Sequence, residues 1–256
     1  DIDVICFTHY HADHVMGITG LLLTIANSGR TAPLIIIGPE GLLKVITGLT
    51  VVSPCLPYEI DLVELNFNLK KDLQNKILKI EDMEIFAMPV CHSIECLTYS
   101  IHISRKRKFD ANRAKENNVP IKIWSELQKE SIVKYEGKEY KPEMVLGESR
   151  RGIKITYCTD TRPVEELCKF AYKSDLFICE GMYGEDDKKY KAEGKKHMIF
   201  SEAAEIAKNA EVKELWLTHF SPALSEPDKY LQNVRMIFKN SYIGFDRKTK
   251  TINFED

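Results

Sequence analysis

The stretch His9-Tyr10-His11-Ala12-Asp13-His14 restricts the fold of this chain more than any other. It follows Val4-Ile5-Cys6-Phe7, an apolar run of residue types that favour β-strands. On an extended backbone His9 and His11 share one face, while Asp13 and His14 fall where a helix should begin. Imidazole and carboxylate groups together suit zinc or a similar divalent ion. The alternative, a polar strand end with surface histidines, is disfavoured because three of the chain's seven histidines lie in this run.

Composition sets the class of protein. The chain has 256 residues, 44% of them hydrophobic, which is enough for one large domain with a continuous core. The net charge of −2 gives no overall basic signature, so any binding of nucleic acid must use local patches. Seven scattered cysteines with no CxxC pair predict reduced thiols in a cytoplasmic protein. These 256 residues show neither a signal-peptide pattern nor an apolar run long enough to span a membrane.

Strand-like and helix-like segments alternate along the chain, which predicts an α/β layered fold with mixed sheets. The expected strands are residues 2–7, 34–37, 83–90, 97–103, 153–158, 176–179, 215–218 and 242–245. The expected helices are residues 15–26, 40–46, 164–172, 202–208 and 228–239. Because the chain opens with Asp1 inside a strand-like segment, we expect strands upstream of it that this sequence lacks.

Three further polar residues each follow an apolar strand. His92 follows strand 83–90, Asp160 follows strand 153–158, and His219 follows strand 215–218. Strand ends that open onto one edge of a sheet are where sites assemble in α/β proteins. Taken singly, each histidine could be structural, and Asp160 could be a turn or cap residue. Together with the histidine-rich run they supply seven ligands, which suits two metal ions sharing one carboxylate.

At this point the sequence resembles the metallo-β-lactamase superfamily and, within it, the ribonuclease Z family, whose members mature tRNA 3′ ends. The resemblance covers nearly the whole chain. It rests on three motifs: Phe7 to Gly17 leading into Gly20-Leu21-Leu22, Tyr157-Cys158-Thr159-Asp160-Thr161-Arg162-Pro163, and Leu217-Thr218-His219-Phe220-Ser221. It implies an αβ/βα metallo-β-lactamase sandwich over residues 1–256, formed as a single domain.

The resemblance also implies a ligand arrangement. His9, His11 and His92 would hold a first zinc ion, and Asp13, His14 and His219 a second, with Asp160 bridging them. Manganese is the alternative metal. Two such ions can clamp a phosphodiester and activate water, and Asp13 could accept a proton from that water.

His197, in Lys195-Lys196-His197-Met198-Ile199-Phe200, matches a histidine that the family places opposite the metals, and Glu180 matches a glutamate that pairs with it. We predict that His197 is a general acid or proton shuttle oriented by Glu180, because the departing 3′ oxygen of RNA needs a proton. The alternative is a solvated histidine in the Lys-rich stretch 188–196.

Residues 104–151 form a charged segment between two strand-like ones, and they resemble in position the protruding arm with which the family grips tRNA. Between Ser104 and Lys115 there are six Lys or Arg (105, 106, 107, 108, 113 and 115) against one Asp. Each phosphate that they neutralise would add salt-dependent affinity. The alternative is an ordinary solvated excursion.

The sequence therefore predicts a zinc-dependent endoribonuclease that removes the 3′ trailer of precursor tRNA and leaves a 3′-hydroxyl on the tRNA. The resemblance implies a homodimer. One alternative is another hydrolase of this fold that acts on small phosphodiesters or other esters. A second is a non-catalytic, metal-stabilised RNA-binding subunit.

Overall fold

The computed structural model describes residues 2–53, 55–66, 75–129 and 131–255. The chain divides into two compact units. The first comprises Asp1–His102 and Lys154–Thr251, and the second comprises Ile103–Ile153 and Ile252–Asp256.

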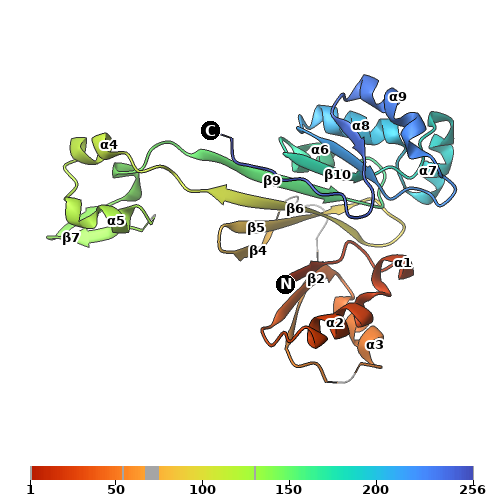
Figure 1. The fold of residues 1–256 in the computed structure, drawn as a ribbon, viewed down its shortest axis with the longest axis horizontal. Helices are drawn as coiled ribbons and strands as arrows, with labels where there is room; N and C mark the ends of the chain where they lie inside the picture. Colours follow the sequence, from red (N-terminus) through yellow and green to blue (C-terminus); the bar gives the residue numbers. More distant parts are fainter. Residues whose placement is uncertain (1, 54, 67–74, 130, 256) are drawn as a thin grey trace. The chain divides into compact units, whose positions relative to one another are not determined.

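Two sheets build the first unit, as Figure 1 shows. β1 (Val4–Cys6), β2 (Leu34–Pro39) and β3 (Ile60–Leu65) form a parallel sheet in that order. The larger sheet has seven strands, in the spatial order β12 (Ser241–Ile243), β11 (Leu215–Thr218), β10 (Leu176–Glu180), β9 (Arg150–Cys158), β6 (Cys96–Arg105), β5 (Met83–Val90) and β4 (Asn75–Ile80). Strands β9 to β12 are parallel, whereas β4 and β5 are antiparallel. The mixed sheets expected from the sequence are therefore confirmed.

Helices cover the outer face of each sheet. α2 (Ile18–Asn27) and α3 (Leu42–Thr50) pack on the smaller sheet, where Leu22 and Leu42 meet Ile36. α6 (Glu165–Ala171), α8 (Phe200–Asn209) and α9 (Leu231–Ile237) pack on the larger sheet through residues such as Phe200, which shares a core with Phe177.

A third core lies between the sheets and contains Ile37, Ile85, Leu97 and Tyr99. Neighbouring residues Ile36 and Ile37 thus enter different cores, as the alternation of side chains along a strand requires. The resulting order of layers is helix, sheet, sheet, helix. The predicted αβ/βα sandwich is confirmed.

The second unit has its own small core. It contains α4 (Ala111–Glu116), α5 (Trp124–Leu127) and the antiparallel hairpin of β7 (Val133–Tyr135) with β8 (Lys138–Tyr140). Buried residues from these elements and their connections form the core: Ala114, Val119, Ile123, Leu127, Val133, Tyr140, Val145 and Leu146. The elements are short, which is why the sequence of this segment shows no clear periodicity.

Several elements differ from the sequence predictions. β3 and β4 were not predicted, because charged residues interrupt them: Asp61 and Glu64 in β3, Lys76 and Lys79 in β4. Both strands lie at the edges of their sheets, where charged side chains prevent pairing with other chains. The helix expected at residues 228–239 is instead a short 3₁₀ turn, Pro227–Tyr230, followed by α9.

Among the helices in the described part of the chain, none is both long and apolar enough to cross a lipid bilayer.

Candidate active site

The predicted ligands lie at the ends of strands of the first unit, around the buried carboxylate of Asp160. His9 follows β1, His92 follows β5, Asp160 follows β9, and His219 follows β11. The short helix α1 (Ala12–Val15) starts after His11 and carries Asp13 and His14. The Asp160 side chain is 4% exposed. α6 is preceded by Val164 as its N-cap, so Asp160 does not serve as a helix cap.

Four imidazoles face the Asp160 carboxylate. The Nε2 atoms of His9 and His92 each lie 3.6 Å from Oδ2, and that of His14 lies 3.7 Å from the same oxygen. His219 Nε2 lies 3.3 Å from Oδ1. These residues, with His11, divide into two sets that share Asp160: His9, His11 and His92 in one, His14 and His219 in the other. Each set could hold one metal ion.

The donor spacing fits a tetrahedral ion. His11 Nδ1 lies 3.0 Å from His9 Nε2 and 3.3 Å from His92 Nε2. Two nitrogens that bind one tetrahedral zinc at about 2.1 Å would lie about 3.4 Å apart. Because neutral imidazole and carboxylate are also the ligands that zinc prefers, the residues present fit a metal centre.

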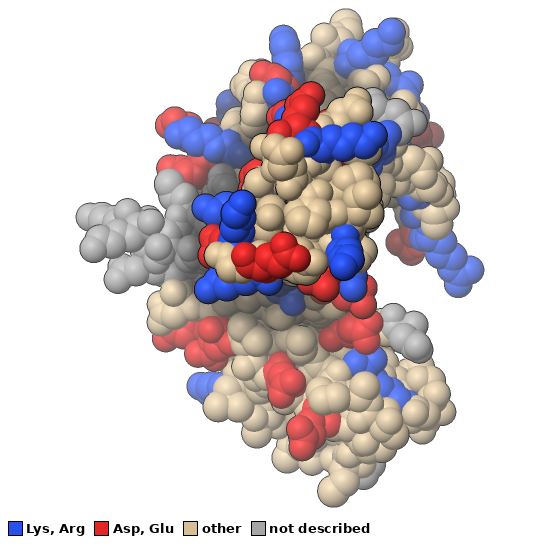
Figure 2. Space-filling model, turned by 90° about the vertical axis from the view of Figure 1, so that its left-hand side faces the viewer, with Lys and Arg blue, Asp and Glu red and all other residues tan. Residues whose placement is uncertain are grey.

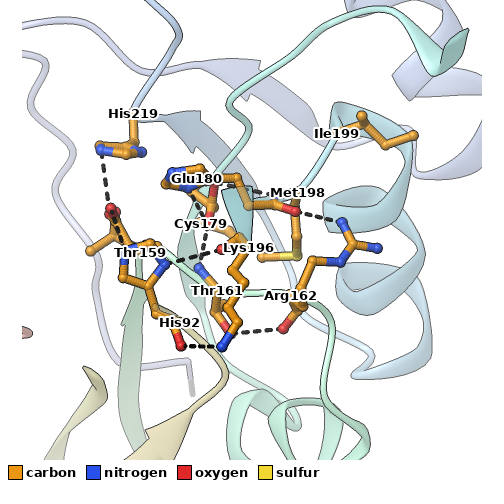
Figure 3. Close-up of polar contacts among 12 residues, drawn as sticks. His92, Thr159, Thr161, Arg162, Cys179, Glu180, Lys196, Met198, Ile199 and His219 are labelled. Carbon is orange, nitrogen blue, oxygen red and sulfur yellow. Dashed lines mark hydrogen bonds and ion pairs between the residues drawn. The ribbon is translucent and has the colours of Figure 1, made fainter. Parts of the chain in front are cut away.

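Neighbouring groups orient two of these rings through the ring nitrogen that faces away from Asp160. The Nδ1 atom of His9 lies 3.1 Å from Thr8 Oγ1, and the Nδ1 atom of His92 lies 3.1 Å from the carbonyl oxygen of Lys196. The Lys196 ammonium in turn donates to the carbonyl of His92 (Figure 3). Hydrogen bonds to the outer nitrogen fix the tautomer and turn Nε2 toward the site.

Asp160 and His219 have left-handed backbones, with φ of 49° and 57°. Non-glycine residues adopt this region rarely and at a cost in free energy, so it persists where the surroundings enforce it. Here the abrupt change of direction just past β9 and β11 brings both side chains over the strand ends. The left-handed backbones therefore help to place these two predicted ligands.

Burial favours the neutral form of three of the imidazoles, those of His9, His92 and His219. Burial lowers the pKa of His9 to about 4, although Asp160 opposes the shift. Burial also lowers the pKa values of His92 and His219. Burial alone would raise the pKa of Asp160, but His219, the Thr159 hydroxyl and His9 outweigh it and lower the pKa. These three imidazoles thus favour the neutral form and Asp160 the ionised form, which are the forms that bind a cation.

Asp13 is placed differently from the other six predicted ligands. Its side chain is 80% exposed, and its Oδ2 lies 3.7 Å from His14 Nε2. It lines the same cavity as the other groups but lies outside both sets around Asp160. An exposed carboxylate at the edge of the cavity is accessible to water.

His197 and Glu180 are paired beside the ligand cluster. His197 Nδ1 lies 3.1 Å from Glu180 Oε2, and the two residues are 9% and 0% exposed. Burial raises the pKa of Glu180, and the hydrogen bond from His197 offsets part of that shift. Burial lowers the pKa of His197, but Glu180 outweighs it, so the net pKa is raised. The backbone N–H groups of Thr161 and Met198 also donate to the Glu180 carboxylate, which fixes its position (Figure 3).

A cavity of about 530 Å³ joins these groups. Its lining includes His11, Asp13, His14, His92, Asp160, His197 and His219, with Phe220 and Pro222 at one side. One open space thus brings together six of the seven predicted metal ligands, among them the exposed carboxylate of Asp13, with the predicted proton donor His197. This arrangement suits hydrolysis of a phosphate ester.

Sequence reasoning missed the residues that support this site. Thr8, Lys196, Arg162 and Glu202 all contact the predicted site residues or the backbone around them. Arg162 lies two positions after Asp160, which was the available signal. Its partner Glu202 is 40 residues away, and no spacing in the sequence indicates the pair.

Comparison with known proteins shows the family to which this chain is related. The family profile described as the metallo-beta-lactamase superfamily matches residues 1–94. A protein named Ribonuclease Z from Clostridium acetobutylicum is 72% identical over 256 residues, which are 100% of this chain and 83% of that protein. Another protein of the same name, from Clostridium kluyveri, is 58% identical over 256 residues, again 100% of this chain and 83% of that protein.

Solved structures with this fold include human tRNase Z, short form. It superimposes with a TM-score of 0.66 at 21% identity, covering 99% of this chain and 80% of that one. The metallo-beta-lactamase fold protein YhfI from Bacillus subtilis has a TM-score of 0.59 at 18% identity, covering 94% and 74%. At these identities the structural likeness supports the fold.

Proposed function

The chain belongs to the ribonuclease Z family of the metallo-β-lactamase superfamily, and we propose that it is an endoribonuclease that removes the 3′ trailer from precursor tRNA, leaving a 3′-hydroxyl on the tRNA. The observation that carries the proposal is the Asp160 carboxylate, buried under four imidazole nitrogens within 3.7 Å at the strand ends. The 72% identical relative named Ribonuclease Z supports the choice of RNA over other esters.

The proposal includes two zinc ions, or manganese in their place. His9, His11 and His92 would hold the first, and Asp13, His14 and His219 the second, with Asp160 shared. Bound there, such ions would polarise a phosphodiester and make water a stronger nucleophile near neutral pH. Asp13 would complete the second set, since its Oδ2 already lies 3.7 Å from His14 Nε2.

The chain's own residues would supply the proton transfers. The Asp13 carboxylate would accept a proton from the attacking water as the new phosphorus–oxygen bond forms. His197 would donate a proton to the 3′ oxygen of the tRNA as its bond to phosphorus breaks. Glu180 would hold the ring through Nδ1, at 3.1 Å, and direct the other nitrogen toward the cavity. The trailer would leave with the phosphate, and the tRNA with a free hydroxyl.

The second unit would bind the tRNA body. Its sequence concentrates positive charge at Arg105–Lys108, but Figure 2 shows Lys and Arg side chains interspersed with Asp and Glu over this unit. Arg107 Nη2 lies 3.6 Å from Glu143 Oε1, and Arg113 Nη2 lies 3.0 Å from Glu148 Oε1. Folding therefore partly neutralises the basic segment, and we expect fewer phosphate contacts than its six cations suggest.

We also propose that the enzyme is a cytoplasmic homodimer. All seven cysteines are free thiols, which suits a reducing compartment. Apolar side chains on and beside α1 and α3 are exposed, among them Met16 at 62%, Leu43 at 63% and Val51 at 79%. A second copy packed there would cover them. Sedimentation of the wild type and of Leu43→Asp tests the assembly: a monomeric wild type would contradict it.

The activity is tested by giving the chain two substrates, a precursor tRNA and bis(p-nitrophenyl) phosphate, with zinc or manganese. We expect cleavage of both, and loss of both in Asp160→Ala. Hydrolysis of the small diester without cleavage of RNA would assign the chain to another hydrolase of this fold. Tight binding of tRNA with neither reaction would indicate a non-catalytic subunit.

A further inference from the structure

The Arg162 side chain connects the backbone of the predicted proton donor, His197, to α8. Its guanidinium Nη1 donates to the carbonyl oxygen of His197 at 2.5 Å and to Glu202 Oε2 at 2.9 Å. Nη2 donates to Glu202 Oε1 at 2.5 Å. The Arg162 side chain is 17% exposed and that of Glu202 is 9% exposed. This is a bidentate, largely desolvated ion pair with one further hydrogen bond aimed at the His197 backbone.

The backbone of Arg162 reaches the other side of the site. Its N–H donates to the carbonyl of Cys91 at 2.9 Å, and the N–H of Cys91 donates to the Thr161 hydroxyl at 2.9 Å. Cys91 immediately precedes His92, and Thr161 immediately follows Asp160. Arg162 therefore ties two predicted ligand segments together through its backbone and the His197 segment to them through its side chain.

Glu202 anchors this arrangement to a helix. It lies in the first turn of α8, and its Oε2 also accepts from the N–H of Ile199 at 3.1 Å. Between His197 and Ile199, the N–H of Met198 donates to Glu180 at 3.2 Å. Figure 3 shows this segment beside Arg162 and Glu180. The backbone from His197 to Ile199 is thus held at successive residues by Arg162, Glu180 and Glu202.

We propose that Arg162 is a positioning residue for proton donation: it fixes the His197 backbone so that the imidazole meets the leaving oxygen. The inference rests on the proposed function of His197. Arg162 does not serve as a phosphate ligand, because its donors are directed at Glu202 and the His197 carbonyl and its side chain is mostly buried. Lysine cannot reproduce the role, since one ammonium lacks the planar fork that reaches both acceptors.

The test compares kcat for substrates whose leaving groups differ in their need for a proton. A p-nitrophenolate leaves without being protonated, whereas phenolate and the 3′ oxygen of RNA need a proton donor far more. In Arg162→Lys we expect kcat to fall about tenfold for precursor tRNA and for an aryl phosphodiester with a phenol leaving group. For bis(p-nitrophenyl) phosphate we expect a fall of less than about threefold. Arg247→Lys, a change at an exposed arginine, is the matched control.

A double-mutant cycle with His197→Ala asks whether Arg162 acts through the histidine. We expect Arg162→Lys to cost little further activity when His197 is already absent. Equal losses on all leaving groups, with lower zinc content, would show a general structural role and overturn the proposal. Additive losses in the cycle would also overturn it. The aryl diesters keep the inference testable apart from RNA cleavage, whose failure in the wild type would refute only the proposed substrate.

Discussion

Asp160 is the residue on which the account depends most. Its carboxylate is the one group shared by both potential metal sets, and four histidines surround it. In Asp160→Ala we expect bound zinc to fall and phosphodiester cleavage to drop by about a thousandfold or more, since metal activation is worth several kcal/mol. Metal analysis of the purified protein and kcat measure the two effects. Asp246→Ala, at an exposed position, is the control. Full zinc content in Asp160→Ala would contradict the ligand assignment.

His102 lies away from the predicted metal site and lets us test how folding stability depends on pH. Its ring is partly buried on β6, packs against Phe86 at 4.4 Å, and lies 3.0 Å from Ser100 Oγ through Nε2. Burial, and then the charge of Lys154, lower its pKa from 6.5 to about 4.

Above pH 6.5 the ring is neutral in both the folded and unfolded states. As the pH falls, the unfolded state binds the proton first, so stability is lost between about pH 6.5 and 4. In His102→Asn we expect the free energy of unfolding to fall less between pH 7 and pH 5 than it does in the wild type. The difference should be on the order of 1 kcal/mol, because solvent screens a half-buried group. Urea unfolding of both proteins at pH 7 and pH 5 measures it. An equal loss of stability in the wild type and in His102→Asn would contradict the lowered pKa of His102.

At the residue scale, local spacing predicted Asp160 and the histidines that cluster around it. The positions of His9, His11 and His14 follow from one short motif, and His92, Asp160 and His219 from the strands that they follow. The supporting contacts were not predictable. Arg162 meets Glu202, and Lys196 meets His92, only after distant segments have folded together. The left-handed backbones of Asp160 and His219 leave no mark in the residue types.

Among the secondary elements, α4 of the second unit depends on a side-chain cap. Asp110 Oδ1 accepts from the N–H groups of Asn112 and Arg113, both at 3.0 Å. Asp110→Ala should cost about 1 kcal/mol of local stability, and Asp110→Ser should retain most of it. Amide hydrogen exchange over residues 111–117 compares the three proteins. Unchanged protection in Asp110→Ala would contradict a stabilising cap.

The apolar interior strands were predictable as elements, whereas two of the four edge strands of the first unit, β3 and β4, were not. β2, β10 and β11 consist almost entirely of apolar residues. Each lies in the interior of its sheet, with a neighbouring strand on both sides. β3 and β4 carry charges at their solvent-facing positions and resemble loops in sequence. The charges that keep an edge strand from pairing with other chains also make it hard to recognise from its sequence pattern.

For the whole molecule, the basic segment Arg105–Lys108 provides the test of RNA binding. Replacing all four residues with Ala should weaken binding to precursor tRNA and reduce the slope of log affinity against log salt by about 2, since each lost phosphate contact removes roughly 0.9. Turnover of bis(p-nitrophenyl) phosphate should not change. Filter binding at several salt concentrations gives the slope. Equal losses on RNA and on the small diester would refute a role in gripping tRNA.

The most direct measurement is the position of the cut. An end-labelled precursor tRNA is incubated with the chain after chelation and again after zinc or manganese is restored, with Asp160→Ala in parallel. The account predicts one metal-dependent cut just after the discriminator nucleotide, leaving a 3′-hydroxyl, and none with the variant. Cleavage that persists without metal, or in Asp160→Ala, or at scattered positions would contradict it.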